Sequence, residues 1–119
     1  MRAGGAIVNV SSVAGLRATG SSLPYGVSKA ALTQLTRGLA LAPAVRVNGV
    51  APGVVASHWF THLIGGEGAE EVYETAKAGT PLGRTLEPPD VSQIVLALLA
   101  GDGVTGETVV IDGGRAITR

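Results

Sequence analysis

The sequence predicts an α/β fold with a parallel sheet, because short apolar runs alternate with longer segments of helical character. Three runs rich in β-branched residues, at 6–10, 45–51 and 107–112, are bounded by glycine, proline or serine. Two helical segments, 24–42 and 88–100, lie between them. Strands that alternate with helices are typical of parallel βαβ units with right-handed crossovers.

The first helix is expected to follow a polar loop at 11–22 and to run from Pro24 to about Ala42. Proline suits the first turn of a helix, and Ser21 or Ser22 precedes it as a possible N-cap. Pro43 should stop the helix. One face carries leucines at helical spacing: Leu32, Leu35 and Leu39.

The segment between the second strand and the last helix is expected to be mostly irregular. Residues 54–87 follow the turn signal Pro52–Gly53 and are interrupted by Gly65, Gly66 and Gly68. A helical piece at 69–78 carries several glutamates, which suit a solvated helix face. The last helix, 88–100, begins with two prolines and Asp90 and ends at Gly101.

Composition sets broad limits on the function. A length of 119 residues allows one small domain, which we take to span 1–119. Nine basic residues balance nine acidic ones, which argues against a nucleic-acid binder. The sequence has no cysteine, no apolar run long enough to span a membrane and no recognisable signal peptide. We therefore expect a cytoplasmic protein without a membrane or nucleic-acid partner.

Tyr25 and Lys29 form the first candidate for chemistry. They lie four residues apart in a helical segment, so their side chains should share a face. A phenol alone is a poor acid or base near neutrality, but a neighbouring ammonium stabilises the phenolate. Such a pair can exchange a proton with a substrate oxygen. Taken alone, a Tyr-x-x-x-Lys pair is a weak signal, since it also occurs by chance.

Two loops strengthen this candidate because each follows a predicted strand. Ligands in open α/β sheets bind beyond the carboxyl ends of the strands. The loop "NVSSVAG" places Ser11 and Ser12 there, where a hydroxyl could stabilise charge on a substrate oxygen. The loop "APGVVAS" brings Gly53, which allows a close approach of the backbone to a ligand. Taken alone, each loop is better explained as an ordinary turn.

Taken together, the chain resembles the carboxyl-terminal half of a short-chain dehydrogenase/reductase. The matching pieces are "GAIVNVSSVAG", "YGVSKAAL", "VRVNGVAPG", "PLGRTLEPPDV" and "VTGETVVIDGG", which occur in the family's order and cover nearly all of 4–114. The resemblance implies a partial Rossmann-like, doubly wound parallel sheet made of the last three strands and their helices. It also implies hydride transfer between NAD or NADP and an alcohol or ketone substrate.

The resemblance assigns a role to each matching residue. Tyr25 would be the general acid/base, Lys29 would support it and hold the nicotinamide ribose, and Ser12, 13 positions before the tyrosine, would hydrogen-bond the reacting oxygen. The expected cofactor-binding residues are Tyr25, Lys29, Pro52, Gly53, Val54, Val55 and Ser57. Serine at position 57 replaces the threonine usual in the family, and its hydroxyl could keep the same hydrogen bond.

The amino-terminal, nucleotide-binding half of the family's domain has no counterpart in this sequence. The stretch "GGEGAEE" at 65–71 lacks the spacing of a phosphate-binding turn and follows no predicted strand. Neither the substrate nor the choice between NAD and NADP can be read. Without that half, the first strand would have an unpaired edge and the leucine face would be exposed, so we expect a homo-oligomer.

Two readings of the function follow, and two further ones are weaker. The chain is either the catalytic half of an oxidoreductase or a catalytically silent fragment that associates with itself. Serine hydrolysis would need Ser12, His58 or His62, and Asp112, but the sequence has no G-x-S-x-G elbow. His58 and His62 have the spacing of some zinc ligands, but no third ligand accompanies them, and we expect no metal. Trp59, Phe60, Leu63 and Ile64 could line a substrate pocket or simply pack the segment.

Overall fold

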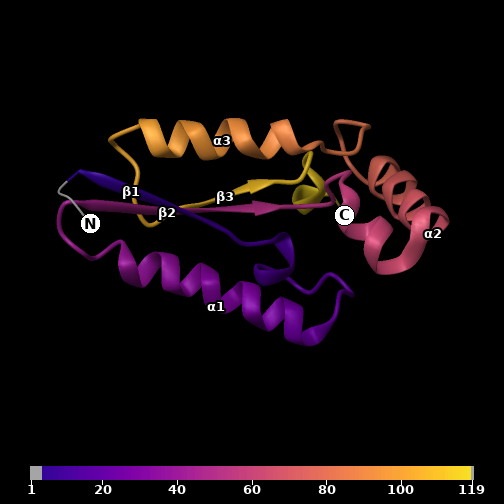
Figure 1. Ribbon diagram of the computed structural model, residues 1–119, viewed down its shortest axis with the longest axis horizontal. Helices are drawn as coiled ribbons and strands as arrows, with labels where there is room; N and C mark the ends of the chain where they lie inside the picture. Colours follow the sequence, from indigo (N-terminus) through magenta and orange to yellow (C-terminus); the bar gives the residue numbers. More distant parts are fainter. Residues whose placement is uncertain (1–3, 119) are drawn as a thin grey trace.

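The computed structural model describes residues 4–118 as a three-layer α/β unit (Figure 1). The strands are β1 (Gly5–Val10), β2 (Val45–Pro52) and β3 (Thr108–Ile111). The α-helices are α1 (Leu23–Leu39), α2 (His58–Ala78) and α3 (Pro88–Ala100), and the short 3₁₀ turns are η1 (Val13–Gly15) and η2 (Arg115–Ile117). The alternation of strands and helices predicted from the sequence is confirmed.

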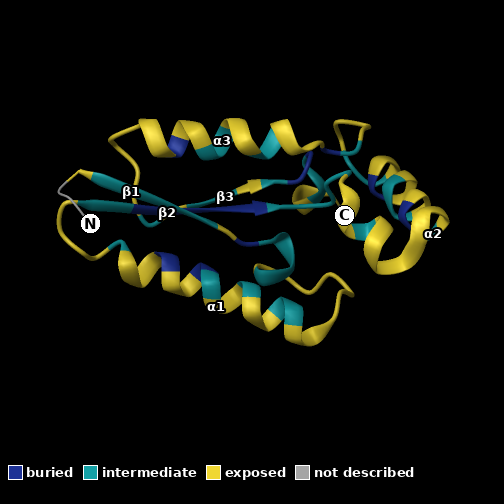
Figure 2. Ribbon diagram, viewed as in Figure 1, coloured by how far each residue is buried: buried dark blue, intermediate teal, exposed yellow. Residues whose placement is uncertain are grey.

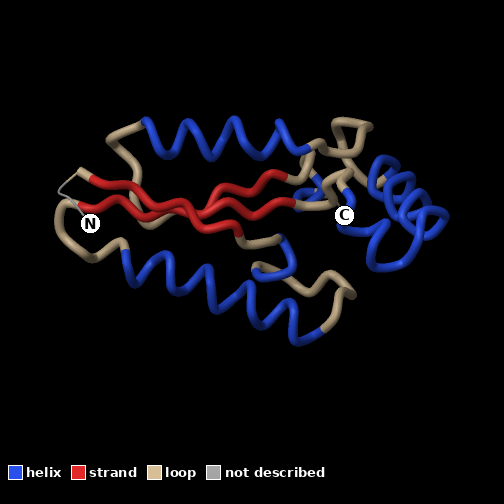
Figure 3. Tube along the Cα trace, viewed as in Figure 1, coloured by secondary structure: helices blue, strands red, loops and turns tan. Residues whose placement is uncertain are grey.

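The three strands form one parallel sheet in the order β1-β2-β3. Gly5 pairs with Val45 and Val10 with Val50, while Pro52 pairs with Ile111. α1 covers one face of the sheet and α3 the other, and α2 lies beyond the carboxyl ends of the strands (Figures 1 and 3). This is the doubly wound arrangement that the resemblance implied. Within residues 4–118, β1 pairs with β2 alone, so its other edge is unpaired, as expected.

β2 is the centre of the core because it has a neighbour on both sides (Figure 2). Val47, Val50 and Ala51 are fully buried. Asn48 is buried as well, and its amide donates to the Val104 carbonyl (2.8 Å) and accepts from the Glu107 amide (3.1 Å). These two bonds satisfy the buried amide and fix the chain that enters β3.

α1 turns threonines, not leucines, toward the sheet. Thr33 and Thr36 are its buried residues, and the Asn9 amide donates to the Thr36 hydroxyl (2.9 Å). The predicted leucine face points outward: Leu35 and Leu39 are exposed and Leu32 is half-buried. Ser22 is the N-cap residue, as one of the two candidates, but its side chain makes no capping bond.

Two predicted boundaries are wrong. α1 ends at Leu39 rather than near Ala42, because the chain needs a turn before β2 can begin at Val45. α2 begins at His58 rather than at 69, so most of the segment expected to be irregular is helical. The glycines that suggested irregular structure do break α2, since Gly65 is non-helical (φ 81°, ψ 167°), but the helix resumes after it.

The turn before β2 strains one residue. Ala44 has a φ of 60°, a left-handed conformation in which Cβ crowds the following carbonyl. We expect Ala44→Gly to stabilise the protein by about 0.5–1 kcal/mol, because relief of that crowding outweighs the greater freedom of glycine in the unfolded chain. Urea unfolding measures the change. Ala42→Gly is the control, because Ala42 has an ordinary φ, and it should lower the stability of the protein. A loss of stability in both variants would contradict the strain at Ala44.

Membrane insertion through a helix has no candidate in the described residues. None of the helices within 4–118 combines the length and the apolar character that crossing a bilayer requires.

Candidate active site

The candidate site begins where β1 ends. Ser11 follows the strand, is buried, and continues the sheet through its amide to the Val50 carbonyl (2.8 Å). Its hydroxyl donates to the Lys29 carbonyl (2.9 Å) and shares a hydrogen bond with the Thr33 hydroxyl (3.0 Å). Ser11 therefore ties the end of β1 to the middle of α1, a role that the sequence analysis did not assign to it.

Ser12 is the N-cap of η1. It is extended (φ −162°, ψ 155°), and its hydroxyl oxygen accepts from the Ala14 amide (3.2 Å). An oxygen that accepts at a cap keeps its own proton for donation. Ser12 is half-buried, so this proton can reach a ligand at the carboxyl edge of the sheet.

Lys29 and Tyr25 meet on the first turns of α1. The Lys29 ammonium donates to the Val10 carbonyl (3.1 Å) and lies 5.7 Å from the centre of the Tyr25 ring, within the range of a cation–π contact. Both side chains are half-buried. An ammonium has three N–H groups, so two remain beyond the bond to Val10. The predicted pairing of these side chains on one helix face is confirmed.

Gly15 allows η1 to press directly against α1. A Cβ at this position would lie 2.5 Å from the Lys29 carbonyl carbon and 2.7 Å from the Ala30 amide nitrogen. Only glycine fits, because these are backbone atoms that cannot turn aside. The contact sets the spacing between the loop that carries Ser12 and the helix that carries Tyr25 and Lys29. The sequence contains 18 glycines, and no local pattern distinguishes Gly15 from the others.

The segment after β2 is held from two sides. The Gly53 amide donates to the Ile111 carbonyl (2.8 Å), and a Cβ at Gly53 would lie 3.0 Å from the Asp112 Cβ. Val55 forms an isolated bridge with Leu86, and the Ala56 amide donates to the Leu86 carbonyl (2.8 Å). Pro52, Gly53, Val54 and Val55 are thereby fixed at the carboxyl edge of the sheet, all half-buried.

Ser57 ends this segment and caps α2. It is extended and exposed, and its hydroxyl oxygen accepts from the Trp59 amide (3.4 Å). As at Ser12, the hydroxyl proton remains for a ligand. Ser12 and Ser57 thus follow the ends of the neighbouring strands β1 and β2, and the ammonium of Lys29 reaches the end of β1 from α1. No hydrogen bond joins the Ser12 hydroxyl to Tyr25 or Lys29 in the described part of the chain.

The residues considered for hydrolysis do not assemble. Both carboxylate oxygens of Asp112 accept from backbone amides, those of Gly114 (2.9 Å) and Ala116 (2.7 Å). His58 and His62 pack edge to face with each other, with ring centres 6.1 Å apart. Among residues 4–118, no group of three or more His, Cys, Asp or Glu side chains is placed to hold a metal.

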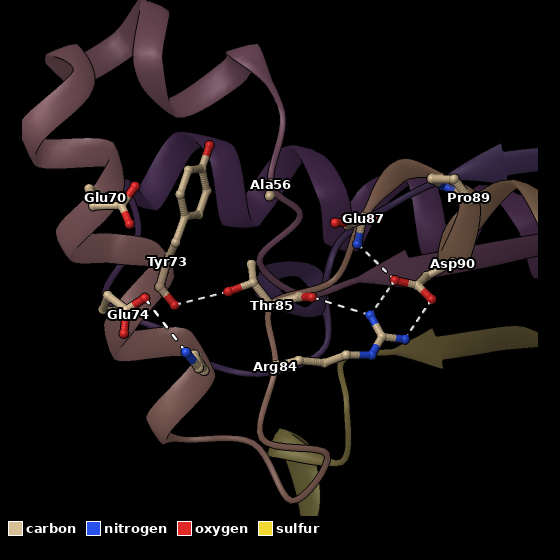
Figure 4. A pocket seen from close by; sticks show the side chains of 10 residues that line it. Ala56, Glu70, Tyr73, Glu74, Arg84, Thr85, Glu87, Pro89 and Asp90 are labelled. Atoms are coloured by element: carbon tan, nitrogen blue, oxygen red, sulfur yellow. Dashed lines mark hydrogen bonds and ion pairs between the residues drawn. The ribbon is translucent and has the colours of Figure 1, made fainter.

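An open cavity of about 610 Å³ is lined by residues of α2 and of the start of α3 (Figure 4), and neither Tyr25 nor Lys29 is among its lining residues. Arg84 lines the cavity and donates to the two carboxylate oxygens of Asp90 through its two terminal guanidinium nitrogens (2.8 and 2.7 Å). Asp90 also accepts from the Glu87 amide (2.7 Å) at the start of α3. The hydrogen bonds from Arg84 and from the Glu87 backbone hold the pKa of Asp90 well below its usual range.

This depressed pKa gives a pH-dependent contribution to stability. Asp90 binds a proton more readily in the unfolded chain, so its contribution is present above the ordinary pKa of 3.8 and is lost as the pH falls below it. We expect Asp90→Asn to lower the urea midpoint at pH 7 and to flatten the decline toward pH 2. Glu74→Gln is the control, since its pair with Lys77 is exposed and 3.9 Å long. If the urea midpoint of Asp90→Asn fell toward pH 2 as steeply as that of the wild type, Asp90 would not be the source of the pH dependence.

The chain is similar in sequence to known oxidoreductases. Residues 1–116 match a family model described as enoyl-(acyl carrier protein) reductase. The short-chain dehydrogenase/reductase homolog YusR of Bacillus subtilis is 43% identical, over 95% of this chain and 84% of YusR. Carbonyl reductase family member 4 of Danio rerio is 40% identical, over 93% of this chain and 45% of that protein.

Solved structures agree with the sequence relatives. The structure of ElxO with NADP bound superposes with a TM-score of 0.80 at 30% identity, over 95% of this chain and 47% of the ElxO chain. The chain therefore spans less than half the length of ElxO and of carbonyl reductase family member 4, but most of the length of YusR.

Proposed function

The chain belongs to the short-chain dehydrogenase/reductase family of oxidoreductases, and from this premise we propose that it forms the catalytic half of an NAD(P)-dependent enzyme. The observation that carries the proposal is the position of the Lys29 ammonium between the Tyr25 ring and the end of β1. This arrangement puts a positive charge beside a phenol at the edge of the sheet where ligands of α/β folds bind.

Each residue has a defined part in the reaction. Tyr25 gives a proton to the substrate oxygen during reduction and takes it back during oxidation. Ser12 donates a hydrogen bond to the same oxygen and stabilises the charge that develops on it. The Lys29 ammonium keeps a positive charge beside the Tyr25 ring and offers its remaining N–H groups to ribose hydroxyls. The substrate class is a small-molecule alcohol or ketone.

NAD or NADP is the proposed cofactor; its reduced form would give a hydride to the substrate carbon, and its oxidised form would accept one from it. The donor groups present fit it: the Lys29 ammonium has two N–H groups beyond its bond to Val10, and the Ser57 hydroxyl keeps its proton. Pro52, Gly53, Val54 and Val55 would lie along the nicotinamide, with Tyr25, Lys29 and Ser57 completing the site. The NADP bound to ElxO, a solved relative, supports this choice.

Binding of NADH and NADPH to the 119-residue chain tests the proposal. We expect saturable binding by calorimetry, which Lys29→Ala weakens at least tenfold because charge-assisted hydrogen bonds to the ribose are lost. A folded chain that binds neither nucleotide, or a Lys29→Ala variant that binds as well as the wild type, would overturn the site.

Self-association is a second candidate function, and the outer face of α1 favours it. Exposed apolar side chains lie along α1 at spacings of four or eight residues: Leu23 (78%), Val27 (60%), Leu35 (51%) and Leu39 (41%). Exposed apolar area of this kind marks an interaction surface. We propose a homo-oligomer that buries it. Sedimentation of the wild type against Leu35→Lys tests this, and a monomeric wild type would exclude it.

A further inference from the structure

The hydroxyl of Tyr73 makes two hydrogen bonds to the backbone of one residue, Ser57. It donates to the Ser57 carbonyl (2.7 Å) and accepts from the Ser57 amide (3.3 Å). Sixteen positions separate the two residues, so this is a contact between distant parts of the segment. The hydroxyl of Tyr73 therefore donates its single proton and accepts with its oxygen at the same time.

The conformation of Ser57 explains how one hydroxyl reaches both groups. Ser57 is extended (φ −152°, ψ 177°), and in an extended residue the N–H and C=O point to the same side. Tyr73 thus takes the place that a neighbouring strand would take. It stabilises the extended conformation of Ser57, from which the Ser57 hydroxyl reaches the Trp59 amide at the start of α2.

The break at Gly65 makes the contact possible, because α2 doubles back there. The positive φ of Gly65 divides α2 into the segments 58–64 and 66–78, and Tyr73 lies on the second. Its ring packs edge to face on Phe60 of the first segment, with ring centres 5.9 Å apart. The Thr85 hydroxyl holds the Tyr73 carbonyl (3.1 Å), and Figure 4 shows the ring beside Ala56, next to Ser57 in the chain.

We propose that Tyr73 is a positioning residue for the cofactor site, acting through Ser57. This inference rests on the proposed function, in which Ser57 binds the nicotinamide end of the cofactor. Without the hydroxyl, the backbone of Ser57 is left to water, and segment 58–64 gains freedom to move about Gly65. Cofactor binding must then order this segment, which weakens affinity.

Tyr73→Phe in the full 119-residue chain tests the inference, because it removes the hydroxyl and keeps the ring on Phe60. Trp59 is the only tryptophan, so its fluorescence anisotropy reports on segment 58–64 without any cofactor. We expect a lower anisotropy, a urea midpoint close to that of the wild type, and an NADPH dissociation constant raised about tenfold. The control is Thr75→Val, which removes an exposed hydroxyl from the same helical segment and should change none of the three.

The anisotropy of Trp59 and the dissociation constant of NADPH together separate this inference from the proposed function. An unchanged anisotropy in Tyr73→Phe overturns the positioning role, whatever the cofactor does. A lower anisotropy with unchanged NADPH affinity also overturns it, because Tyr73 then has only a structural part. A wild type that binds no NADPH refutes the cofactor site itself, while a lower anisotropy in the variant still supports the hold of Tyr73 on Ser57.

Discussion

Replacing Tyr25 with phenylalanine is expected to reduce turnover about 10²- to 10⁴-fold, the range typical for loss of a general acid or base. The substitution removes the phenolic oxygen but leaves the ring against the Lys29 ammonium, 5.7 Å from its centre. Affinity for NADPH should therefore change little. The measurement is carbonyl reduction followed by NADPH absorbance, in a chimera that joins this chain to the amino-terminal half of a family member.

Ser28→Ala is the matched control for this experiment. Ser28 lies on the same turn of α1, is exposed, and donates its hydroxyl proton to the Tyr25 carbonyl (2.7 Å), so this proton is already used within the helix. Its loss should leave turnover within about twofold. Turnover retained in Tyr25→Phe would remove the tyrosine as the acid/base, and equal losses in both variants would point to damage of the helix instead.

Replacing Gly15 with alanine is expected to destabilise the protein by about 2–3 kcal/mol, a large part of the stability of a small domain. The new Cβ would meet the Lys29 carbonyl carbon at 2.5 Å, so η1 and α1 must separate. Since η1 follows Ser12 and α1 carries Tyr25, we also expect cofactor binding to weaken. Urea unfolding and NADPH calorimetry measure the two effects.

Gly38→Ala provides a control of opposite sign. Gly38 lies on the same helix, and a Cβ there meets nothing within 4 Å. Alanine should stabilise α1 by about 0.5–1 kcal/mol because it is the better helix former. If both variants were stabilised, the close contact at Gly15 would be refuted.

The strands and the Tyr25–Lys29 pair could be predicted from local patterns. β2 is a short run rich in valine between Pro43 and Pro52, and β-branched residues bounded by such turn signals favour a strand. The pairing of Tyr25 with Lys29 needs only the helical period, which places residues four apart on one face. The roles proposed for Ser12 and for segment 52–57 came from the family resemblance, not from these patterns.

The contacts that hold the site together could not be predicted in the same way. Ser11, Gly15 and Tyr73 contact partners more than ten positions away, through the packing of one element on another. The helical and strand periodicities of a sequence do not indicate such contacts. The glycines near residue 65 do mark a break, as the sequence suggests. In the sequence, however, a helix interrupted by glycines looks the same as an irregular segment, so the start of α2 at His58 could not be predicted.

The inward threonines of α1 have a consequence for the order in which the structure opens. Thr33 and Thr36 bury little apolar area, and two of the leucines that would bury more, Leu35 and Leu39, are exposed. A helix without a covered apolar face is held weakly by its surroundings. We expect amide hydrogens of α1 to exchange with deuterium faster than those of β2, and this exchange to slow when a partner covers Leu35. Equal protection of the two elements would show that the threonine contacts suffice.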